Sequence, residues 1–521
     1  MTRNALAARG ANIDGVALVA ALATIICAAP AIAVIGLALA RSDGGADFGG
    51  DLLANGAFGT GALMAAGGLG AIVFGAASAA LVSLCRFPGR GLFEWLLVVP
   101  LAAPSYILAY AYASLTWAGG VSPLRIEGFW GAAFIYAVGL YPYVYLAARA
   151  AFVSQSLGAL EAARTLGAKP GNVFWRVALP MARPAIAAGG ALAMMEIAAD
   201  YGAAHHFGLT TLSTAIFRAW YAHGAPSMAL QISAVLLLGA LVFLILERRA
   251  RGRASFAAAL TRAKPAPRYQ LAALPALGAV ALCGGLVASG ALLPLAWLLR
   301  LALLHANVED VAGPFLNSML LSGGGALVTL ALAAAIAVAA RRANAFGKAS
   351  LYAAAAGYAA PGAVIAMGAL ALFGLAREAG WIGGLGPALA VTALIWTYAA
   401  RFASAGVQPI DAGLTRLSKG LDASARTLGA GPWRRFARVD LPIAAPSLAA
   451  AALILFVEIL KELPATLILR PFNFDTLAVK AYSYASDERL LEAAAPALLI
   501  FLVGLAPILI LTRGIGQVGR R

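Results

Sequence analysis

Long apolar stretches dominate the sequence, and each is about as long as a helix that crosses a lipid bilayer, which needs roughly 20 residues. Hydrophobic residues fill 62% of the 521 positions and charged residues only 12%, so ionisable side chains are too few to cover a water-exposed surface. We therefore expect an all-α integral membrane protein with about twelve transmembrane helices. The stretches cover residues 15–40, 59–85, 93–117, 129–150, 184–204, 228–247, 271–300, 318–340, 350–375, 387–404, 443–464 and 492–513.

Arginine and lysine gather after every second stretch, which indicates the orientation because positive charge accumulates in cytoplasmic loops. Both termini are therefore expected in the cytoplasm. The first stretch is expected to be an uncleaved anchor, because it is longer than a signal-peptide core. This orientation accounts for the net charge of +16, so nucleic-acid binding is not expected. The basic residues include Arg86 and Arg90, then Arg164, Lys169, Arg176 and Arg183, then Arg248, Arg249, Arg251 and Arg253, and later Arg341, Arg342, Lys348, Arg513, Arg520 and Arg521.

A segment of the first half recurs 262 residues later in the second half. Identical pairs at this spacing are Arg164/Arg426, Thr165/Thr427, Leu166/Leu428, Gly167/Gly429, Pro170/Pro432, Phe174/Phe436, Arg176/Arg438, Leu179/Leu441, Pro180/Pro442 and Pro184/Pro446. Chance does not produce such a run, so we expect two homologous six-helix halves related by an axis along the membrane normal. We assign residues 1–250 to the first half, 251–270 to a cytoplasmic linker and 271–521 to the second half.

Each repeated segment combines helix-forming residues, a glycine, a proline and a second short amphipathic stretch, which predicts a short helix outside the membrane. Gly167 and Gly429 suit the left-handed position that ends a helix. Pro180 and Pro442 suit the first turn of the next span. A loop that packs on its own membrane domain is one interpretation. Two copies with the same small residues favour the other, a protrusion that fits a groove in a partner.

The repeated segments resemble the cytoplasmic loop of binding-protein-dependent ABC importer permeases. That loop reads Glu-Ala-Ala, three residues, Gly, nine residues, a hydrophobic residue, one residue and Leu-Pro. The first copy matches at Glu161, Ala162, Ala163, Gly167, Val177, Leu179 and Pro180. The second copy departs at its head, which has Asp422, Ala423 and Ala425, and then matches at Gly429, Val439, Leu441 and Pro442.

Longer passages resemble the fused, double-length ferric-iron permeases of this superfamily; they cover residues 101–112, 195–220 and 461–490. The resemblance implies a type I importer permease in a bacterial inner membrane that works by alternating access. It also implies a periplasmic binding protein that delivers ferric iron, and two copies of an ABC ATPase subunit that hold the loops around Gly167 and Gly429. Thiamine and phosphonate permeases of the same class are the alternatives for the cargo.

The sequence contains no phosphate-binding loop of the form GxxxxGK[ST], and the nearest match, Gly347 to Ser350, has its hydroxyl one place late. No Ser/His/Asp arrangement, HExxH motif or cysteine cluster is present either. We therefore expect a permease that is not an enzyme and binds no cofactor, with ATP on a partner subunit. An ion-coupled secondary transporter is the alternative from another class, and its uptake would be abolished directly by a protonophore.

Two pairs of acidic residues fall inside predicted spans, where ionisable groups are costly and mark functional sites. Glu196 and Asp200 are four positions apart, as are Glu458 and Glu462, and the pairs correspond in the repeat. Such spacing places both acids of a pair on one helix face, and hard cations prefer carboxylate oxygen. One hypothesis is a transient cation path without a stable metal site. The alternative is a structural role, in which Lys461 pairs with Glu458 and the acids lie near water.

His205 and His206 stand beside tyrosines, including Tyr201 and Tyr221, and invite an interpretation as iron ligands. Histidine in an interfacial loop is more often a satisfied polar residue, and a permease must release its cargo quickly. Both interpretations stay open from the sequence.

Overall fold

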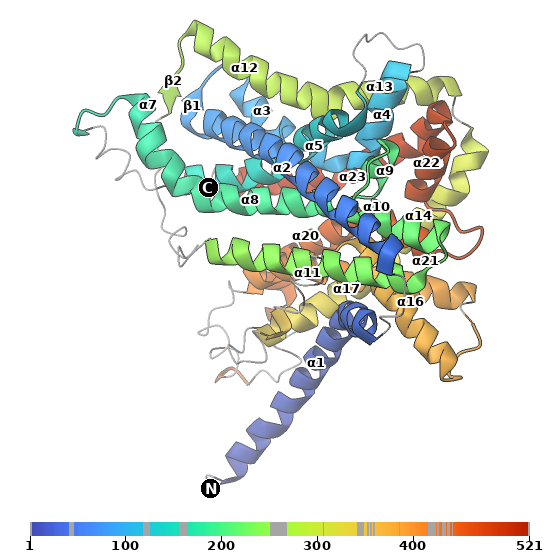
Figure 1. Cartoon of the computed structure of the whole chain (residues 1–521). Coiled ribbons are helices and arrows are strands. Elements are labelled where there is room, and N and C mark those ends of the chain that lie inside the picture. The colour runs from blue at the N-terminus through green and yellow to red at the C-terminus, as the bar shows by residue number, and fades with distance from the viewer. Residues whose placement is uncertain are drawn as a thin grey trace. The chain divides into compact units, whose positions relative to one another are not determined.

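The structure is a computed structural model, and helices make up most of the described chain (Figure 1). It describes residues 3–40, 46–117, 126–155, 165–250, 268–305, 307–340, 349–351, 354, 357, 360–384, 386–414, 424, 427–429, 434, 438–439 and 441–518. The helices are α1 (Arg3–Ala40), α2 (Ala46–Leu84), α3 (Arg90–Leu96), α4 (Ser105–Trp117), α5 (Gly128–Ser154), α7 (Pro170–Val173), α8 (Leu179–Ala199), α9 (Gly202–His206), α10 (Leu212–Phe217), α11 (Pro226–Ala250), α12 (Ala273–Val287), α13 (Leu293–His305), α14 (Val308–Ala340), α16 (Gly362–Glu378), α17 (Pro387–Leu414), α20 (Leu441–Leu460), α21 (Pro464–Leu469), α22 (Leu477–Ser486) and α23 (Leu490–Val518). Shorter elements are the 3-10 turn η1 (Val99–Ala102), the π-helical turns η2 (Phe174–Ala178), η3 (Arg218–Ala222) and η5 (Ala288–Leu292), and the two-residue strands β1 (Cys85–Arg86) and β2 (Tyr269–Gln270). The predicted all-α class is confirmed.

Among the described residues, ten helical segments are long and apolar enough to cross a membrane. The third predicted span is a bent pair, Arg90–Ala102 and Ser105–Thr116, whose parts meet at 92°. Pro104 separates them, and the preceding Ala103 is extended because a residue before proline disfavours helical backbone. Pro361 takes the corresponding place before α16, which begins at the next residue and has 17 residues. Both repeats therefore break a predicted span at a proline.

The chain packs as two compact units. The first contains Met1–Gly44, Ala219–Leu237 and Ala312–Val479, and the second contains Gly45–Arg218, Leu238–Val311 and Lys480–Arg521. Each unit combines the central helices of one repeat with terminal helices of the other. The units thus cut across the sequence halves 1–250 and 271–521, whose boundaries stay a prediction. The predicted linker at 251–270 lies outside the described residues except for its last three positions.

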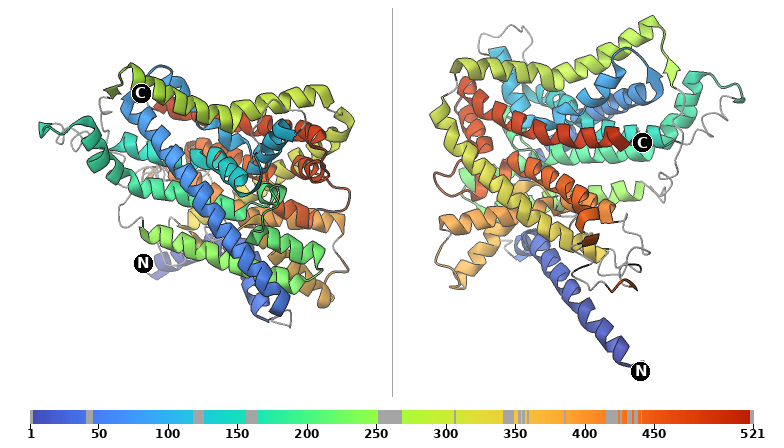
Figure 2. Two further views of the ribbon diagram at one scale, coloured as in Figure 1. Left: turned by 45° about the horizontal axis from the view of Figure 1, so that its top comes forward. Right: turned by 180° about the vertical axis from the view of Figure 1, so that it is seen from behind.

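In the second unit, α2, α5 and α8 pack on one another through glycines. A Cβ at Gly75 would lie 2.6 Å from the Tyr141 carbonyl oxygen, and one at Gly189 would lie 2.6 Å from Val144 Cα. Such distances leave room only for hydrogen, so small residues set the close approach of these helices. α13 packs beside α23, as the right-hand view of Figure 2 shows. β1 and β2 pair in parallel and fix the end of the linker beside the end of α2.

In the first unit, α1 packs on α16 and α17, which belong to the other repeat. Trp396 in α17 donates a hydrogen bond from Nε1 to the Ile26 carbonyl oxygen at 2.8 Å. A Cβ at Gly368 in α16 would lie 2.0 Å from the Pro30 carbonyl oxygen of α1. The first helix of one repeat is therefore built into the core formed by the other.

Candidate functional sites

The two repeated segments end a helical turn in the same backbone conformation. Gly167 has φ of 80° and Gly429 has φ of 76°, and both are exposed. This left-handed conformation strains any residue with a Cβ, so the turn favours glycine, as the sequence indicates. The predicted residues at the heads of these segments lie outside the described residues; they are Glu161, Ala162, Ala163, Asp422, Ala423 and Ala425.

An exposed leucine precedes each of these glycines. Leu166 is 87% exposed and Leu428 is 86% exposed. Burying such a side chain in a partner yields about 1.5–3 kcal/mol, so a matched pair of exposed leucines is suited to docking. Leu166 and Leu428 are one of the identical pairs of the repeat, so the sequence alone shows that they correspond. The sequence pattern that could have suggested docking is an apolar residue directly before the glycine that ends a helix, in both copies.

The repeated segments run directly into spans. α8 starts at Leu179 and Pro180, and α20 starts at Leu441 and Pro442. In the first copy α7, η2 and α8 follow one another without a gap and the spanning segment runs from Gly171 to Ala199, so Pro180 lies where the π-helical turn meets the α-helix and not in the first turn of a span. The segments with the exposed leucines therefore connect directly to membrane-spanning helices, which can transmit a movement of a docked partner.

The second acid of each predicted pair lies beyond the end of its span rather than on the helical face. Asp200 follows α8 in an extended conformation and accepts hydrogen bonds from the N–H groups of Ala203 and the next residue, at 2.8 and 3.3 Å. Glu462 follows α20 and accepts from the N–H groups of Ala465 and the next residue, at 3.0 and 3.1 Å. Both carboxylates therefore cap short helices, α9 and α21, by satisfying N–H groups at their first turn.

The Asp200 carboxylate is held by hydroxyl groups. Ser105, the first residue of α4, donates to Oδ2, and Tyr136 in α5 donates to Oδ1 at 3.1 Å. Within the described part of the chain, no cationic side chain contacts this carboxylate. The acid thus joins α4, α5 and α9 within the second unit.

The Glu462 carboxylate is held by a cation instead. Arg401 in α17 approaches it with Nη1 2.8 Å from Oε1, and the Glu462 side chain has no exposed surface. A Cβ at Gly362 would lie 2.2 Å from the same oxygen. Gly362 corresponds to Ser105 of the first repeat, because each directly follows its proline. Since glycine has no side chain, Gly362 leaves room for Glu462, which is longer than the corresponding Asp200.

The first acid of each pair lies within a span. Glu458 forms an ion pair with Lys461, with Oε1 2.8 Å from Nζ, which is the pairing that the i,i+3 spacing suggested. Glu196 occupies the corresponding position in α8 and is half-buried. All four acids thus have interactions within the structure.

His205 and His206 lie in α9, directly after the Asp200 cap. The His205 ring stacks on Tyr201 at 5.2 Å between centroids, and His206 meets the Tyr110 ring edge-on at 5.1 Å. Burial lowers the pKa of His205 and lowers the pKa of His206 to about 4, so both rings are neutral at neutral pH. Tyr221 donates to a backbone carbonyl oxygen. Among the described residues, no three His, Cys, Asp or Glu side chains gather to hold a metal ion.

Comparison with known proteins identifies relatives among permeases. The chain matches the family described as binding-protein-dependent transport system inner membrane component over residues 71–253 and 328–518, so each match contains one repeated segment. It is 27% identical over 455 residues to Fe(3+)-transport system permease protein FbpB 2 of Haemophilus influenzae, with 85% of this chain and 87% of that protein covered. It is 34% identical over 145 residues to sulfate transport system permease protein CysT of Escherichia coli, with 25% and 50% covered. It is 28% identical over 119 residues to spermidine/putrescine transport system permease protein PotC of Escherichia coli, with 23% and 44% covered.

Proposed function

Because the chain belongs to the binding-protein-dependent transport system inner membrane components, we propose that it supplies both membrane-spanning halves of an ATP-driven importer for ferric iron. Membership of the family makes it a multi-pass protein of the inner membrane. It also implies two kinds of partner, a substrate-binding protein and an ATPase. The family match occurs once in each repeat, which supports one polypeptide as the source of both halves.

Ferric iron is the cargo that the extent of similarity supports best. The similarity to the Fe(3+) permease covers 85% of this chain and 87% of that protein, whereas the sulfate and polyamine permeases align over half or less of their own length. The molybdenum transport system permease protein ModB of Escherichia coli, 28% identical, aligns over 33% of this chain and 82% of itself. Thiamine and phosphonate are the alternative cargoes within the same class. No step in the coupling to ATP depends on which of these cargoes is carried.

The observation that carries the coupling proposal is the matched pair of docking elements, Leu166-Gly167 and Leu428-Gly429. One element per repeat provides for two ATPase subunits, each with its own groove. The basic residues around these segments favour a cytoplasmic position for them and for both termini. ATP is bound by the partner subunits, because the sequence lacks a phosphate-binding loop, and this chain needs no cofactor.

In the proposed cycle, ATP binding draws the ATPase subunits together and carries the docked segments with them. The movement passes into α8 and α20, because each follows its segment directly in the chain. The two repeats then open outward to receive cargo from the binding protein, and hydrolysis returns them to the inward-open state. This is alternating access with the energy supplied from outside the chain.

Asp200 and Glu462 serve this cycle as caps that hold the short helices after the spans. The proposed cation path therefore depends on the two acids inside the spans, Glu196 and Glu458, of which Glu458 is paired with Lys461. Replacing Glu196 and Glu458 by glutamine and measuring iron uptake at unchanged expression tests this path. Reduced uptake is expected, and normal uptake removes the path from the proposal.

The coupling proposal is tested by co-purification of the full chain with its ATPase. Leu166→Ser and Leu428→Ser should each weaken the complex, and the double variant should lose it while the chain stays folded, because both side chains are exposed. Leu303→Ser, a change at another exposed leucine (78%), serves as the matched control. Wild-type recovery of the ATPase with the double variant would contradict the proposal. Iron uptake that stops with a protonophore while ATP is maintained would instead favour a secondary transporter.

A further inference from the structure

Four arginines from segments distant in the sequence gather at one end of the second unit. Arg86 lies in β1, Arg90 begins α3, Arg149 lies in the last two turns of α5, and Arg268 directly precedes β2. The pairing of β1 with β2 holds Arg268 in place, since the Leu271 N–H donates to the Arg86 carbonyl oxygen at 3.2 Å. Arg268 itself donates from Nε to the Ser83 carbonyl oxygen at 3.4 Å. We call these four side chains the arginine cluster.

The arginine cluster holds more positive charge than its acidic partner balances. Glu94 forms ion pairs with Arg149 and with Arg90, whose Nη1 lies 3.2 Å from Glu94 Oε2. Within the described part of the chain, Arg86 and Arg268 form no ion pair. Burial lowers the pKa of Arg268, and the positive charges of the other three arginines lower it further, while Glu94 raises it. Four guanidinium groups thus crowd around one carboxylate, and a bound anion would relieve their repulsion.

Exposed leucines flank the arginine cluster where two spans begin. Leu92 lies two residues after Arg90 and is 62% exposed. Leu274 and Leu277 lie on the first turns of α12, which packs on α3, and they are 80% and 65% exposed. α12 begins one segment that is long and apolar enough to cross a membrane, and α3 begins the bent pair, so these leucines face acyl chains close to the headgroups. An anion at the arginine cluster therefore has lipid-facing apolar surface beside it.

The arginine cluster lies at the same end of the second unit as the coupling segment of the first repeat, the stretch that carries Leu166 and Gly167. Gln155, which directly follows α5, donates from Nε2 to the Ala178 carbonyl oxygen at 2.7 Å, and Ala178 directly precedes α8. Arg149 lies six residues before Gln155, so it is close to the coupling end of α5. In the proposed function this end faces the cytoplasm, and the headgroups of the cytoplasmic leaflet surround it.

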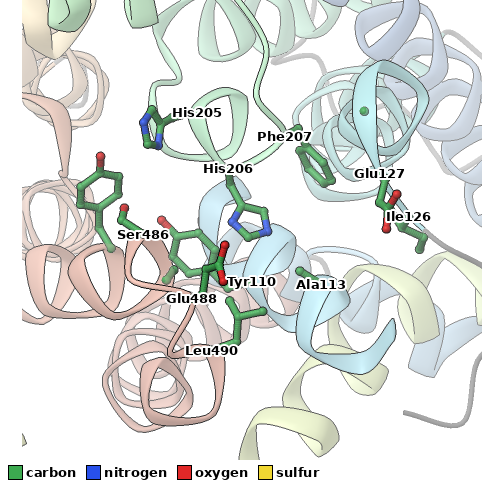
Figure 3. A pocket seen from close by; sticks show the side chains of 13 residues that line it. Tyr110, Ala113, Ile126, Glu127, His205, His206, Phe207, Ser486, Glu488 and Leu490 are labelled. Atoms are coloured by element: carbon green, nitrogen blue, oxygen red, sulfur yellow. The ribbon is translucent and has the colours of Figure 1, made fainter. Parts of the chain in front are cut away.

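Positive charge does not gather at both ends of α5. At the other end, α5 begins at Gly128, beside a pocket whose charged side chains are Glu127 and Glu488 (Figure 3). Orientation in the membrane accounts for basic residues at the coupling end. It does not require four arginines from separate segments to converge on one carboxylate. The convergence therefore indicates a site for an anion.

We propose that the arginine cluster binds the phosphate of an anionic phospholipid in the cytoplasmic leaflet, with the acyl chains along Leu92, Leu274 and Leu277. Arginine suits this role because its planar donors match two phosphate oxygens at once. Basic pockets between spanning helices on the cytoplasmic side recognise anionic headgroups in this way. A lipid held by Arg86 and Arg268 fastens the end of the linker between the repeats to the membrane surface. The choice of leaflet rests on the proposed function, whereas the binding itself does not.

The test is native mass spectrometry of the full chain in detergent micelles, titrated with phosphatidylglycerol or with phosphatidylcholine of the same acyl chains. Wild-type protein should bind one phosphatidylglycerol at least tenfold more tightly than phosphatidylcholine. Arg86→Gln and Arg268→Gln should each weaken phosphatidylglycerol binding about fivefold, and the double variant about 25-fold. Arg90 and Arg149 are left unchanged, because their ion pairs with Glu94 hold α3 on α5.

The matched control removes two arginines that lie outside the arginine cluster. Arg176 and Arg183 are both exposed at the coupling end of the same unit. The Arg176→Gln, Arg183→Gln double variant should change phosphatidylglycerol affinity less than twofold, and all variants should keep the wild-type unfolding midpoint. Three results would each overturn the proposal: unchanged affinity in the Arg86→Gln, Arg268→Gln variant, equal affinity of wild type for the two lipids, or an equal loss in the control variant.

Two competitors separate the lipid from other anionic partners. Inorganic phosphate lacks acyl chains, so it should not displace phosphatidylglycerol at equal concentration, and displacement would make the arginine cluster a site for soluble anions. Lost phosphatidylglycerol binding with full recovery of the ATPase in the Arg86→Gln, Arg268→Gln variant supports the lipid site. Lost ATPase with unchanged lipid binding in that variant would assign the arginine cluster to the ATPase and overturn the lipid site. Failure of the coupling proposal is seen separately, in the variants of Leu166 and Leu428.

Discussion

Breaking the buried ion pair between Arg401 and Glu462 is expected to destabilise the protein strongly. The Glu462 side chain has no exposed surface, and Arg401 exposes 13% of its own. For unit charges about 4 Å apart at an effective dielectric of about 20, the gross attraction is about 4 kcal/mol. Arg401→Met removes it but leaves the N–H hydrogen bonds to Glu462. The expected loss is therefore about 3 kcal/mol, at the lower end of the values for a buried charge left without its partner.

A double-mutant cycle isolates the pair from other effects. Arg401→Met combined with Glu462→Gln removes both charges, and the double variant should be more stable than Arg401→Met alone. The coupling energy should be about 2 kcal/mol. Arg377→Met changes an exposed arginine on a neighbouring helix and should cost less than about 0.5 kcal/mol.

The assay is unfolding of the purified chain in mixed micelles with increasing denaturing detergent, followed by circular dichroism at pH 7. The ion pair does not stabilise the protein if Arg401→Met unfolds at the wild-type detergent fraction, or if the coupling energy is within about 0.5 kcal/mol of zero.

Three further changes test other parts of the structure. Gly368→Val should cost about 1–3 kcal/mol and loosen α1, because its Cβ would overlap the Pro30 carbonyl oxygen; protease cleavage after α1 should accelerate, and an unchanged rate counts against this contact. Asp200→Ala should lower the thermal midpoint more than Asp200→Asn, which keeps an oxygen acceptor for the α9 cap; equal midpoints would exclude the cap. The pKa of His206 in the folded chain, about 4, lies below its unfolded value of about 6.5, so its contribution to stability is present above pH 6.5 and lost as pH falls through about 4. The drop in stability from pH 7.5 to 5 should therefore be smaller in His206→Gln than in wild type, and an equal drop contradicts the assigned shift.

The repeat was the most informative part of the sequence. The same spacing of 262 residues separates corresponding helices in the structure: α8 and α20 begin 262 positions apart, and so do α9 and α21. A glycine at the end of a stretch of helix-forming residues also predicted the left-handed conformation at Gly167 and Gly429. Such features are local, because they depend on backbone geometry and on residues close together in the chain.

The structure adds features that depend on contacts distant in sequence. Apolar length alone does not reveal the 92° bend at Pro104, because the residues on both sides are equally apolar. The i,i+4 spacing predicted one helix face for Glu196 and Asp200, but α8 ends before Asp200 because that acid caps the next helix. The exchange of terminal helices between the repeats, including α1, leaves no local signal, since small apolar residues pack equally well on lipid and on another helix.

The decisive measurement is iron uptake into proteoliposomes that hold the full chain, with the ATPase subunits inside and the binding protein outside. Ferric iron should accumulate only when ATP is enclosed, and the Leu166→Ser, Leu428→Ser double variant should accumulate none. Accumulation without the ATPase subunits, or undiminished uptake by the double variant, would contradict it.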